Sequence, residues 1–370
     1  MGKSEGKIRY AVVGLGHIAQ AAVLPAFEHA SENSQLTAFV SDDSEKLEKL
    51  SKKYGVENCF SYADYERALK SNIFDAVYIA LPNDMHKDFS VTAASKGIHV
   101  LCEKPMAMSV RECEAMIAAA EENSTKLMIA YRLHFEKTNM KAVELVHSGK
   151  IGEPRIFNSS FTMQVKEGNI RTEKEHGGGP LFDIGIYCIN AARYIFKDEP
   201  LEVMAIAAKS NESRFAEIEE AVAVVLKFPK ERLANFICSF GAADISRYEV
   251  VGTEGRVTVD PAYEYVDELK YMLVRGDEEE THKTPKRDQF APELIHFSEC
   301  ILKNQTPRPS GYEGLADVKV IEAIKQSLET RRSVELAHPP AKTSKPDADL
   351  ITEKPPVETA ELVKVESSSK

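Results

Sequence analysis

The hydrophobic pattern of the first 130 residues predicts short buried strands that alternate with helices. Each strand is a continuous apolar run rather than a polar–apolar alternation, which is typical of a parallel sheet covered on both faces. Ser109, with Glu112 following it, forms a capping-box pattern at the start of one helix. The expected strands are 8–13, 36–40, 76–81, 99–102 and 127–130, and the clearest expected helices are 84–95 and 109–120.

After residue 131 the pattern changes to alternating strands with few helices between them, which predicts an open, mostly antiparallel sheet. The expected strands are 155–165, 201–208, 221–228, 233–240, 248–252, 256–259 and 334–336, and the expected helices are 137–147, 180–196, 289–303 and 312–330. From residue 339 the chain is rich in Pro, Ser, Thr, Lys and Glu, which predicts a disordered tail.

These patterns together predict an α/β fold with two domains and a tail. Residues 1–131 are expected to form a Rossmann dinucleotide-binding domain. Residues 132–338 are expected to form an α+β domain, to which the family resemblance described below adds a role in substrate binding and oligomerisation, and residues 339–370 the tail.

Composition and charge narrow the function classes. With 370 residues and 43% hydrophobic residues, the chain can bury a sizeable core. A net charge of −11 without a basic block argues against nucleic acid or an anionic membrane surface as a partner. The polar N-terminus has no apolar signal region, and no apolar stretch approaches the roughly 20 residues of a membrane span, so we expect a cytoplasmic protein. Six scattered cysteines predict reduced thiols and no metal site.

The first strand runs into the sequence G-x-G-x-x-A, from Gly14 to Ala19. Gly14 permits a tight turn and Gly16 lets backbone amides approach a pyrophosphate at the helix N-terminus, which His17 and Ile18 open. This motif predicts dinucleotide binding.

The segment after the second strand supports two different cofactors. Asp42 is placed to hold the ribose 2′-hydroxyl of NAD, whereas Ser41 and Lys46 are placed to hold the 2′-phosphate of NADP. Asp42 and Asp43 are also typical of a plain helix start. The residues alone leave these alternatives open.

Two further segments lie where strands of an open α/β sheet end. Leu81, Pro82, Asn83 and His86 follow one strand, and Asn83 offers a donor and acceptors to a nicotinamide or ribose, although an Asn-Asp turn is the commoner use. The next strand exits into Cys102-Glu103-Lys104-Pro105, where the Lys104 ammonium is placed to polarise a substrate hydroxyl or carbonyl.

The second domain holds one dense motif, from Gly177 to Tyr187. Asp183 and Tyr187 are four residues apart and share a helical face, so we expect a carboxylate and a phenol that complete an acid–base site with Lys104. The alternative is a surface Asp and a core Tyr. Arg132 is a candidate for contact with substrate or nicotinamide, or for a surface salt bridge, and His176 is a weaker candidate for substrate contact.

These motifs together resemble the Gfo/Idh/MocA oxidoreductase family, in order and spacing, from about residue 8 to residue 336. Segments 102–107, 131–135, 183–187 and 311–317 look most similar to its glucose–fructose oxidoreductase branch. The resemblance implies hydride transfer between a nicotinamide cofactor and a sugar or related polyol. It also implies a homodimer or homotetramer that assembles through the C-terminal sheet.

The resemblance also assigns roles. Lys104 matches the family's catalytic lysine, Asp183 its helix carboxylate, and Tyr187 the acid–base residue that is a histidine in most relatives. The branches with tyrosine mostly use NADP(H), with a serine and a lysine at the positions of Ser41 and Lys46, so NADP is favoured over NAD, although Asp42 departs from the glycine common there. The resulting cofactor set is Gly14, Gly16, His17, Ile18, Ser41, Asp42, Lys46, Leu81, Pro82, Asn83, His86, Glu103, Lys104 and Arg132, and the substrate set is Lys104, Arg132, Asp183, Tyr187 and His176.

Two other functions fit the same residues. One is an oxidoreductase of the aldose–aldose or glucose–fructose type, which retains its NADP and passes hydride between two sugars. The other is a nucleotide-binding sensor without catalysis, against which Lys104 and Tyr187 argue.

Overall fold

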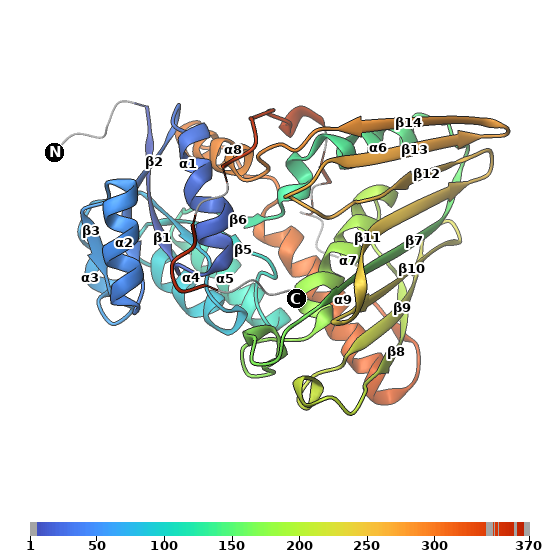
Figure 1. The fold of residues 1–370 in the computed structure, drawn as a ribbon, viewed down its shortest axis with the longest axis horizontal. Helices are drawn as coiled ribbons and strands as arrows, with labels where there is room; N and C mark the ends of the chain where they lie inside the picture. The colour runs from blue at the N-terminus through green and yellow to red at the C-terminus, as the bar shows by residue number, and fades with distance from the viewer. Residues whose placement is uncertain (1–5, 338–342, 344, 347, 359–360, 366–370) are drawn as a thin grey trace. The chain divides into compact units, whose positions relative to one another are not determined.

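The computed structural model describes residues 6–337, 343, 345–346, 348–358 and 361–365, which form two compact units (Figure 1). The first unit contains the chain up to Phe135, Arg287–Leu315 and residues from Thr352 onward. The second contains Glu136–Lys286 and Ala316–Ile351. A single boundary after residue 131 therefore does not describe the division, because two later segments return to the first unit and pack there.

The first unit is built on a six-stranded parallel sheet with the order β3-β2-β1-β4-β5-β6. All of its neighbouring strands run parallel, which confirms the Rossmann arrangement. The strands are β1 (Ile8–Val13), β2 (Ser34–Val40), β3 (Asn58–Phe60), β4 (Ala76–Ile79), β5 (His99–Glu103) and β6 (Leu127–Ala130).

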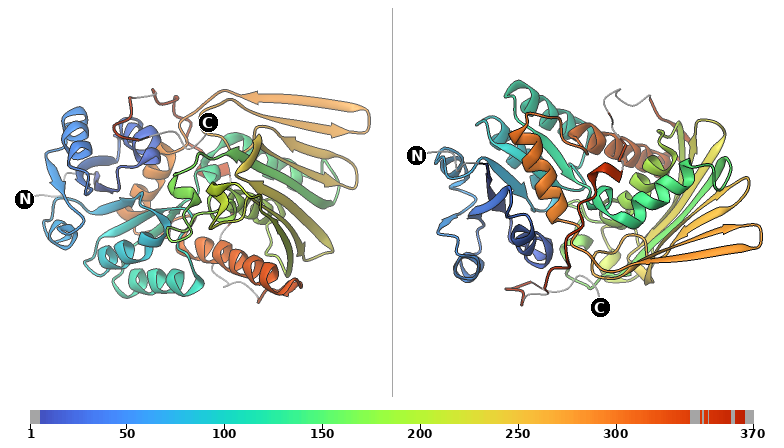
Figure 2. Two further views of the ribbon diagram at one scale, coloured as in Figure 1. Left: turned by 60° about the horizontal axis from the view of Figure 1, so that its bottom comes forward. Right: turned by 90° about the horizontal axis from the view of Figure 1, so that it is seen from above.

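Helices cover both faces of this sheet (Figure 2). The chain moves along the sheet in one direction from β1 to β2 and in the opposite direction from β4 to β5. Because both crossovers are right-handed, their helices lie on opposite faces. Ser109 caps α5 as predicted: its Oγ accepts from the Glu112 N–H at 3.3 Å, and Glu112 in turn accepts from the Met108 N–H at 2.9 Å. The helices are a π-helical turn (Ala19–Val23) that continues into α1 (Leu24–His29), then α2 (Ser44–Tyr54), α3 (Tyr65–Leu69), α4 (His86–Ala94), α5 (Val110–Glu122) and α8 (Ala291–Leu302).

Helix α8 explains why residues 287–315 belong to this unit. It packs against α1, β1 and β2. Its Ser298 hydroxyl lies 2.7 Å from the Tyr10 hydroxyl and 2.8 Å from that of Ser34, and all three side chains are buried. The sheet face over β1 is therefore covered by a helix from far along the chain.

The second unit is built on a nine-stranded open sheet with the order β14-β13-β12-β11-β7-β10-β9-β8-β15. Every pairing is antiparallel except that of β10 with β7, which confirms the expected mostly antiparallel sheet. The strands are β7 (Pro154–Gln164), β8 (Glu202–Ala208), β9 (Ala221–Phe228), β10 (Arg232–Ser239), β11 (Gly241–Gly252), β12 (Arg256–Val259), β13 (Leu269–Arg275), β14 (Glu278–Thr284) and β15 (Val334–Glu335).

Helices α6 (Lys137–His147) and α7 (Ile186–Phe196) pack together against this sheet. The Arg193 guanidinium on α7 is fully buried and ion-paired with Asp317 and Glu199. Asp317 lies on α9 (Gly311–Thr330), which enters this unit at Ala316. The ion pair between Arg193 and Asp317 therefore holds α7 and α9 together.

Several described residues of the expected tail make specific contacts, so disorder is the wrong prediction for them. Lys345 forms an ion pair with Glu199 of the second unit, and a bridge joins the backbones of Lys354 and Asp288 in the first. The other expected tail residues, 339–342, 344, 347, 359–360 and 366–370, lie outside the described residues. Composition fails here because a few specific contacts hold the segment, namely these polar contacts and the burial of Leu350, which is 6% exposed.

Among the described residues, no helix combines the length and apolar character needed to cross a membrane.

Candidate functional site

The glycine loop after β1 has the geometry that a dinucleotide requires. Gly14 has φ +89°, and a Cβ there would lie 2.4 Å from the Ala80 carbonyl oxygen, so only glycine fits. A Cβ on Gly16 would meet nothing within 4 Å, so this glycine borders open space rather than packed chain. The helix begins at once, because the Gln20 N–H donates to the Gly16 carbonyl at 3.1 Å. The loop thus offers room and a helix N-terminus to a diphosphate.

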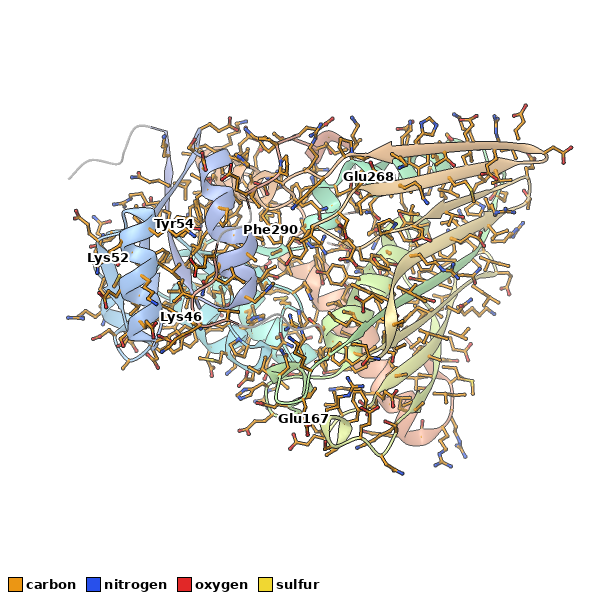
Figure 3. The ribbon with its side chains drawn as sticks, in the orientation of Figure 1. Lys46, Lys52, Tyr54, Glu167, Glu268 and Phe290 are labelled. Carbon is orange, nitrogen blue, oxygen red and sulfur yellow. The ribbon has the colours of Figure 1, made fainter. Side chains whose placement is uncertain are left out.

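The acidic residues after β2 are already engaged by backbone amides. Asp43 caps α2 and accepts from the amides of its first turn at 3.0 and 3.1 Å, which confirms the helix-start alternative for this residue. Asp42 accepts from the Tyr62 N–H at 2.7 Å. Ser41 is 4% exposed and its hydroxyl accepts from the Asp43 N–H at 3.2 Å. Lys46 lies in the first turn of α2 (Figure 3).

The loop after β4 carries Leu81, Pro82 and Asn83, and Asn83 opens a short 3-10 turn, Asn83–Met85. The Leu81 side chain lies close to Gly14, since a Cβ on that glycine would come within 3.0 Å of it. The loop therefore borders the glycine loop, as the prediction for Leu81, Pro82 and Asn83 requires.

His86 does not have the predicted role of a cofactor contact. It is completely buried, with Nδ1 2.9 Å from the Pro105 carbonyl oxygen and Nε2 2.9 Å from that of Leu81. Burial lowers its pKa. His86 instead fastens the loop after β4 to the loop that carries Lys104, which makes it a positioning residue.

Glu103 and Lys104 lie at the carboxyl end of β5. Glu103 is 8% exposed and accepts from the Tyr78 hydroxyl at 2.8 Å and from the Lys104 N–H at 3.3 Å. Burial raises the pKa of Glu103, and the charge of Lys104 opposes that shift. The Lys104–Pro105 bond is cis. The lysine thus sits at the sheet edge that also carries the glycine loop.

Arg132 is a buried cation, so the surface salt bridge considered for it is the wrong alternative. It is 5% exposed and its Nη1 donates to the Gln289 Oε1. Its charge opposes the rise in the pKa of two buried carboxyls, Glu103 and Glu293. The Arg132 charge therefore offsets part of the cost of burying these two carboxyl groups.

Glu293 on α8 was not identified from the sequence. It is 0% exposed, and neither of its carboxyl oxygens has a hydrogen-bond partner in the part of the chain that the structure describes. Burial and the charge of Glu103 raise its pKa well above the usual range. No local pattern could have indicated it, because its neighbours come from β5 and from the segment after β6.

The second unit brings Asp183 and Tyr187 together with an arginine that the sequence did not indicate. Asp183 lies in a π-helical turn, Leu181–Gly185, directly before α7. The Arg171 Nε donates to the Asp183 Oδ2 at 2.7 Å, and the charges of Asp183 and Tyr187 both raise the pKa of Arg171. The Tyr187 ring packs on Phe161, with ring centres 5.6 Å apart. The carboxylate, phenol and guanidinium therefore form one cluster.

The glycine run before this turn lets the Arg171 loop approach. A Cβ on Gly178 would lie 2.5 Å from the Arg171 carbonyl oxygen, and the N–H of Gly179 donates to that same oxygen at 2.9 Å. His176 lies on the same loop, 35% exposed, with Nε2 3.6 Å from Glu173. The glycines thus bring Arg171 to Asp183.

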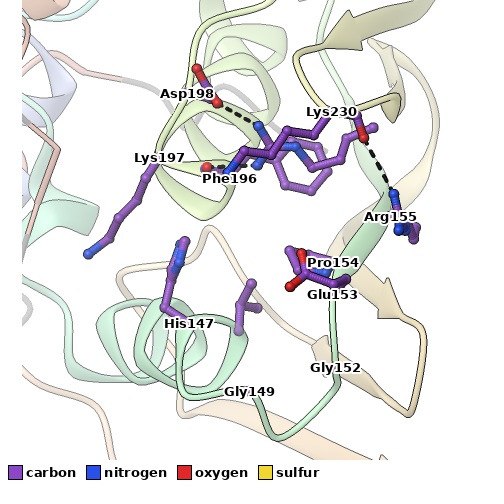
Figure 4. A pocket seen from close by; sticks show the side chains of 12 residues that line it. His147, Gly149, Gly152, Glu153, Pro154, Arg155, Phe196, Lys197, Asp198 and Lys230 are labelled. Carbon is purple, nitrogen blue, oxygen red and sulfur yellow. Dashed lines mark hydrogen bonds and ion pairs between the residues drawn. The ribbon is translucent and has the colours of Figure 1, made fainter.

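A separate cavity of about 400 Å³ lies in the second unit, beside His147 at the end of α6 (Figure 4). Its charged walls are engaged within the protein: Arg232 pairs with Asp198 at 2.6 Å and Arg155 donates to the Lys230 carbonyl at 3.4 Å. Tyr187 and Asp183 do not line this cavity.

Two family models match the chain. The model described as "Oxidoreductase family, NAD-binding Rossmann fold" matches residues 8–131, and the "GFO/IDH/MocA C-terminal domain" matches residues 139–258. These matches cover the parallel sheet of the first unit and most of the antiparallel sheet of the second.

Similar proteins include sugar oxidoreductases. A D-xylose 1-dehydrogenase [NADP(+)] of Haloarcula marismortui is 31% identical, over 90% of this chain and 94% of its own length. The crystal structure of an aldose–aldose oxidoreductase from Caulobacter crescentus, complexed with glycerol, is 37% identical with a TM-score of 0.85, covering 89% of this chain and all of that one. A 3-ketoreductase from Actinomadura kijaniata, in complex with NADP and TDP-benzene, is 27% identical with a TM-score of 0.79, covering 87% and 98%. The chain belongs to the Gfo/Idh/MocA oxidoreductase family.

Proposed function

We propose that this protein is an NADP(H)-dependent oxidoreductase that acts on an aldose or a related polyol. The observation that carries the proposal is that one edge of the parallel sheet holds both the open glycine loop and Lys104, in a chain whose relatives are sugar oxidoreductases. Ligands of open α/β sheets bind at this edge, outside the carboxyl ends of the strands.

NADP(H) fits the residues after β2 better than NAD(H). The Asp42 carboxylate, which would hold a ribose 2′-hydroxyl in an NAD site, accepts from the Tyr62 N–H, and Asp43 is used as a helix cap. Lys46 supplies a cation in the same turn. The xylose dehydrogenase and the 3-ketoreductase, which are named with NADP, support the same choice.

In the oxidation direction, the substrate hydroxyl becomes a carbonyl as its proton and a hydride leave. Tyr187 accepts the proton, and Lys104 stabilises the negative charge that develops on the substrate oxygen. The Arg171–Asp183 pair fixes the carboxylate beside Tyr187 and orients the phenol. NADP, when bound, supplies the acceptor for the hydride. In reduction, Tyr187 returns the proton.

The test is the variant Lys104→Met. It is expected to bind NADPH like the wild type, because the glycine loop is unchanged, and to lose turnover by several orders of magnitude. Lys87→Met removes a neighbouring lysine, which pairs with Asp88 on α4, and is expected to keep turnover. Near-normal turnover of Lys104→Met over a panel of aldoses would refute the proposed chemistry.

A second function has one specific observation in its favour: the aldose–aldose oxidoreductase structure covers this chain at 37% identity. An enzyme of that type retains its nucleotide and passes hydride between two sugars. Mass spectrometry of nucleotide released on denaturation distinguishes the two. Stoichiometric NADP(H), with sugar turnover in the absence of added cofactor, would favour the second function, and an empty protein the first.

We also propose assembly through the exposed face of the second sheet. Apolar side chains alternate with buried ones along β8, β9 and β10, and Ile206 is 69% exposed. A contiguous apolar surface of this kind is typical of an interface, and a second copy of the chain carries the same surface. Ile206→Asp is expected to lower the mass measured by light scattering, whereas Val266→Asp, outside the strands, is not. An unchanged mass for Ile206→Asp would contradict the interface.

A further inference from the structure

The described segment 361–365 lies against the nucleotide-binding loop of the first unit. The Val363 N–H donates to the Gln20 Oε1 at 2.7 Å, and the Gln20 Nε2 donates back to the Val363 carbonyl at 3.0 Å. Gln20 is 2% exposed and also donates to the Leu15 carbonyl at 2.9 Å, between the two glycines of the loop. One buried side chain thus joins the C-terminal segment to the glycine loop, and Figure 1 shows the red segment running alongside α1.

The same segment places a lysine at the end of β2. The Lys364 Nζ lies 3.0 Å from the Glu45 carboxylate and 3.6 Å from that of Asp43. Both acids belong to the start of α2, directly after the strand whose carboxyl end faces the adenosine ribose in a Rossmann domain. The Lys364 side chain is 53% exposed, so a solvent-facing ligand can reach it.

The charges of the turn after β2 explain why the position of Lys364 bears on the choice of cofactor. Asp42, Asp43 and Glu45 give the turn three negative charges, whereas Lys46 gives it one positive charge and Lys49 on the same helix pairs with Glu45 at 2.8 Å, so the net charge of these five residues is −1. A 2′-phosphate carries about two further negative charges, which this turn alone would repel. Lys364 brings the local charge to zero and pairs with two of these acids, Asp43 and Glu45.

We infer that segment 361–365 completes the adenosine end of the cofactor site, with Lys364 as a specificity-determining residue that favours NADP(H) over NAD(H). This inference rests on the proposed use of NADP(H). The phosphate recruits the Lys364 ammonium, which already stands beside the turn, while the Gln20–Val363 hydrogen bonds keep the segment in place.

The chain offers a matched control for this lysine. Lys354, in the described segment 348–358, also pairs with an acid of the first unit, since its Nζ lies 3.5 Å from Glu32. Glu32 precedes β2, whereas the adenosine end follows it. Replacing Lys354 therefore removes one lysine charge from a neighbouring segment of the chain without touching the proposed phosphate position.

The experiment measures the dissociation constants of NADPH and NADH by isothermal titration calorimetry on the full-length protein. Lys364→Gln is expected to weaken NADPH binding about tenfold, the effect of one charge-assisted hydrogen bond, and to leave NADH within about twofold. Lys364→Arg is expected to keep the NADPH preference, and Lys354→Gln to behave as the wild type. The NADPH affinity of Lys364→Gln is also expected to depend less on salt.

The outcomes separate this inference from the proposed function. A wild type that prefers NADPH while Lys364→Gln binds both nucleotides unchanged would overturn the role of Lys364 alone. Tighter NADPH binding by Lys364→Gln would overturn it as well, because the segment would then compete with the phosphate. A wild type that prefers NADH, or binds neither nucleotide, would contradict the proposed cofactor.

Discussion

The buried carboxyl group of Glu293 makes a testable prediction about stability and pH. Its pKa is raised well above the usual range by burial and by the charge of Glu103, and its oxygens are fully enclosed. The folded protein therefore holds a proton on Glu293 at pH values at which the unfolded chain has released it. Between the unfolded pKa of about 4.3 and the folded pKa, the native state binds one more proton.

The sign and the size follow from proton linkage. Where the native state binds the extra proton, the free energy of unfolding falls as pH rises, by about 1.4 kcal/mol per pH unit for one proton. Over the range between the unfolded and the folded pKa, this group alone therefore lowers the stability of the wild type as pH rises. Glu293→Gln has a similar shape and no titration, so it lacks this contribution. The free energy of unfolding of the variant, relative to that of the wild type, is therefore expected to rise steadily with pH over that range.

Urea denaturation of the wild type and Glu293→Gln at pH 5, 6 and 7 gives the difference directly, because all other titrating groups are shared. Glu299→Gln is the control, since Glu299 lies on the same helix, is exposed and pairs with Lys303 at 3.0 Å. The control is expected to follow the wild type at every pH. If the difference in unfolding free energy between Glu293→Gln and the wild type does not change with pH, the reasoning is refuted, because Glu293 is then ionised in the folded protein.

Four further changes have defined outcomes. Gly14→Ala is expected to abolish detectable NADPH binding in calorimetry, because its Cβ would collide with the Ala80 carbonyl; binding at wild-type affinity would contradict this. Gly178→Ala is expected to lower kcat at least about tenfold with an unchanged circular dichroism spectrum, since a 1 Å displacement at a site is costly; an unchanged kcat would exclude the loop from catalysis. Ser109→Ala is expected to cost about 1 kcal/mol of unfolding free energy through the lost cap, measured in urea. Asp317→Ala removes one of the two carboxylates that pair with the buried Arg193 guanidinium and is expected to cost about 3 kcal/mol in the same assay, and a cost no larger than that of Ser109→Ala would disprove the buried pair.

Much of the fold could be predicted from the sequence because its strands have clear hydrophobic patterns. The bounds predicted for the strand 8–13 and for the strand 221–228 are those of β1 and β9, and each is apolar except for one charged residue, Arg9 in β1 and Lys227 in β9. Strand β14 was missed because six of its seven residues are exposed and it has no apolar face to produce a pattern. Strand β14 pairs with β13 through the hydrogen bonds of the backbone.

The site was only partly predictable, for a different physical reason. The glycine loop and Glu103-Lys104 follow strand ends, so local sequence places them. His86 occupies a motif position but is enclosed by two carbonyl groups, and enclosure depends on packing. The path of a loop brings Arg171 to Asp183, and the return of α8 brings Glu293 close to Glu103. Neither approach is encoded in the periodicity of the sequence.

The return of residues 287–315 to the first unit has a consequence for how the chain is made. Residues up to Phe135 leave the ribosome early, but α8, which covers β1 and β2, is synthesised only after the whole of the segment 136–286. We expect the nucleotide-binding unit to stay incompletely covered until α8 has been synthesised, and the second unit to lack α9 until slightly later still. A nascent chain released before residue 287 is therefore expected to depend on chaperones, because it lacks the helix that covers β1 and β2.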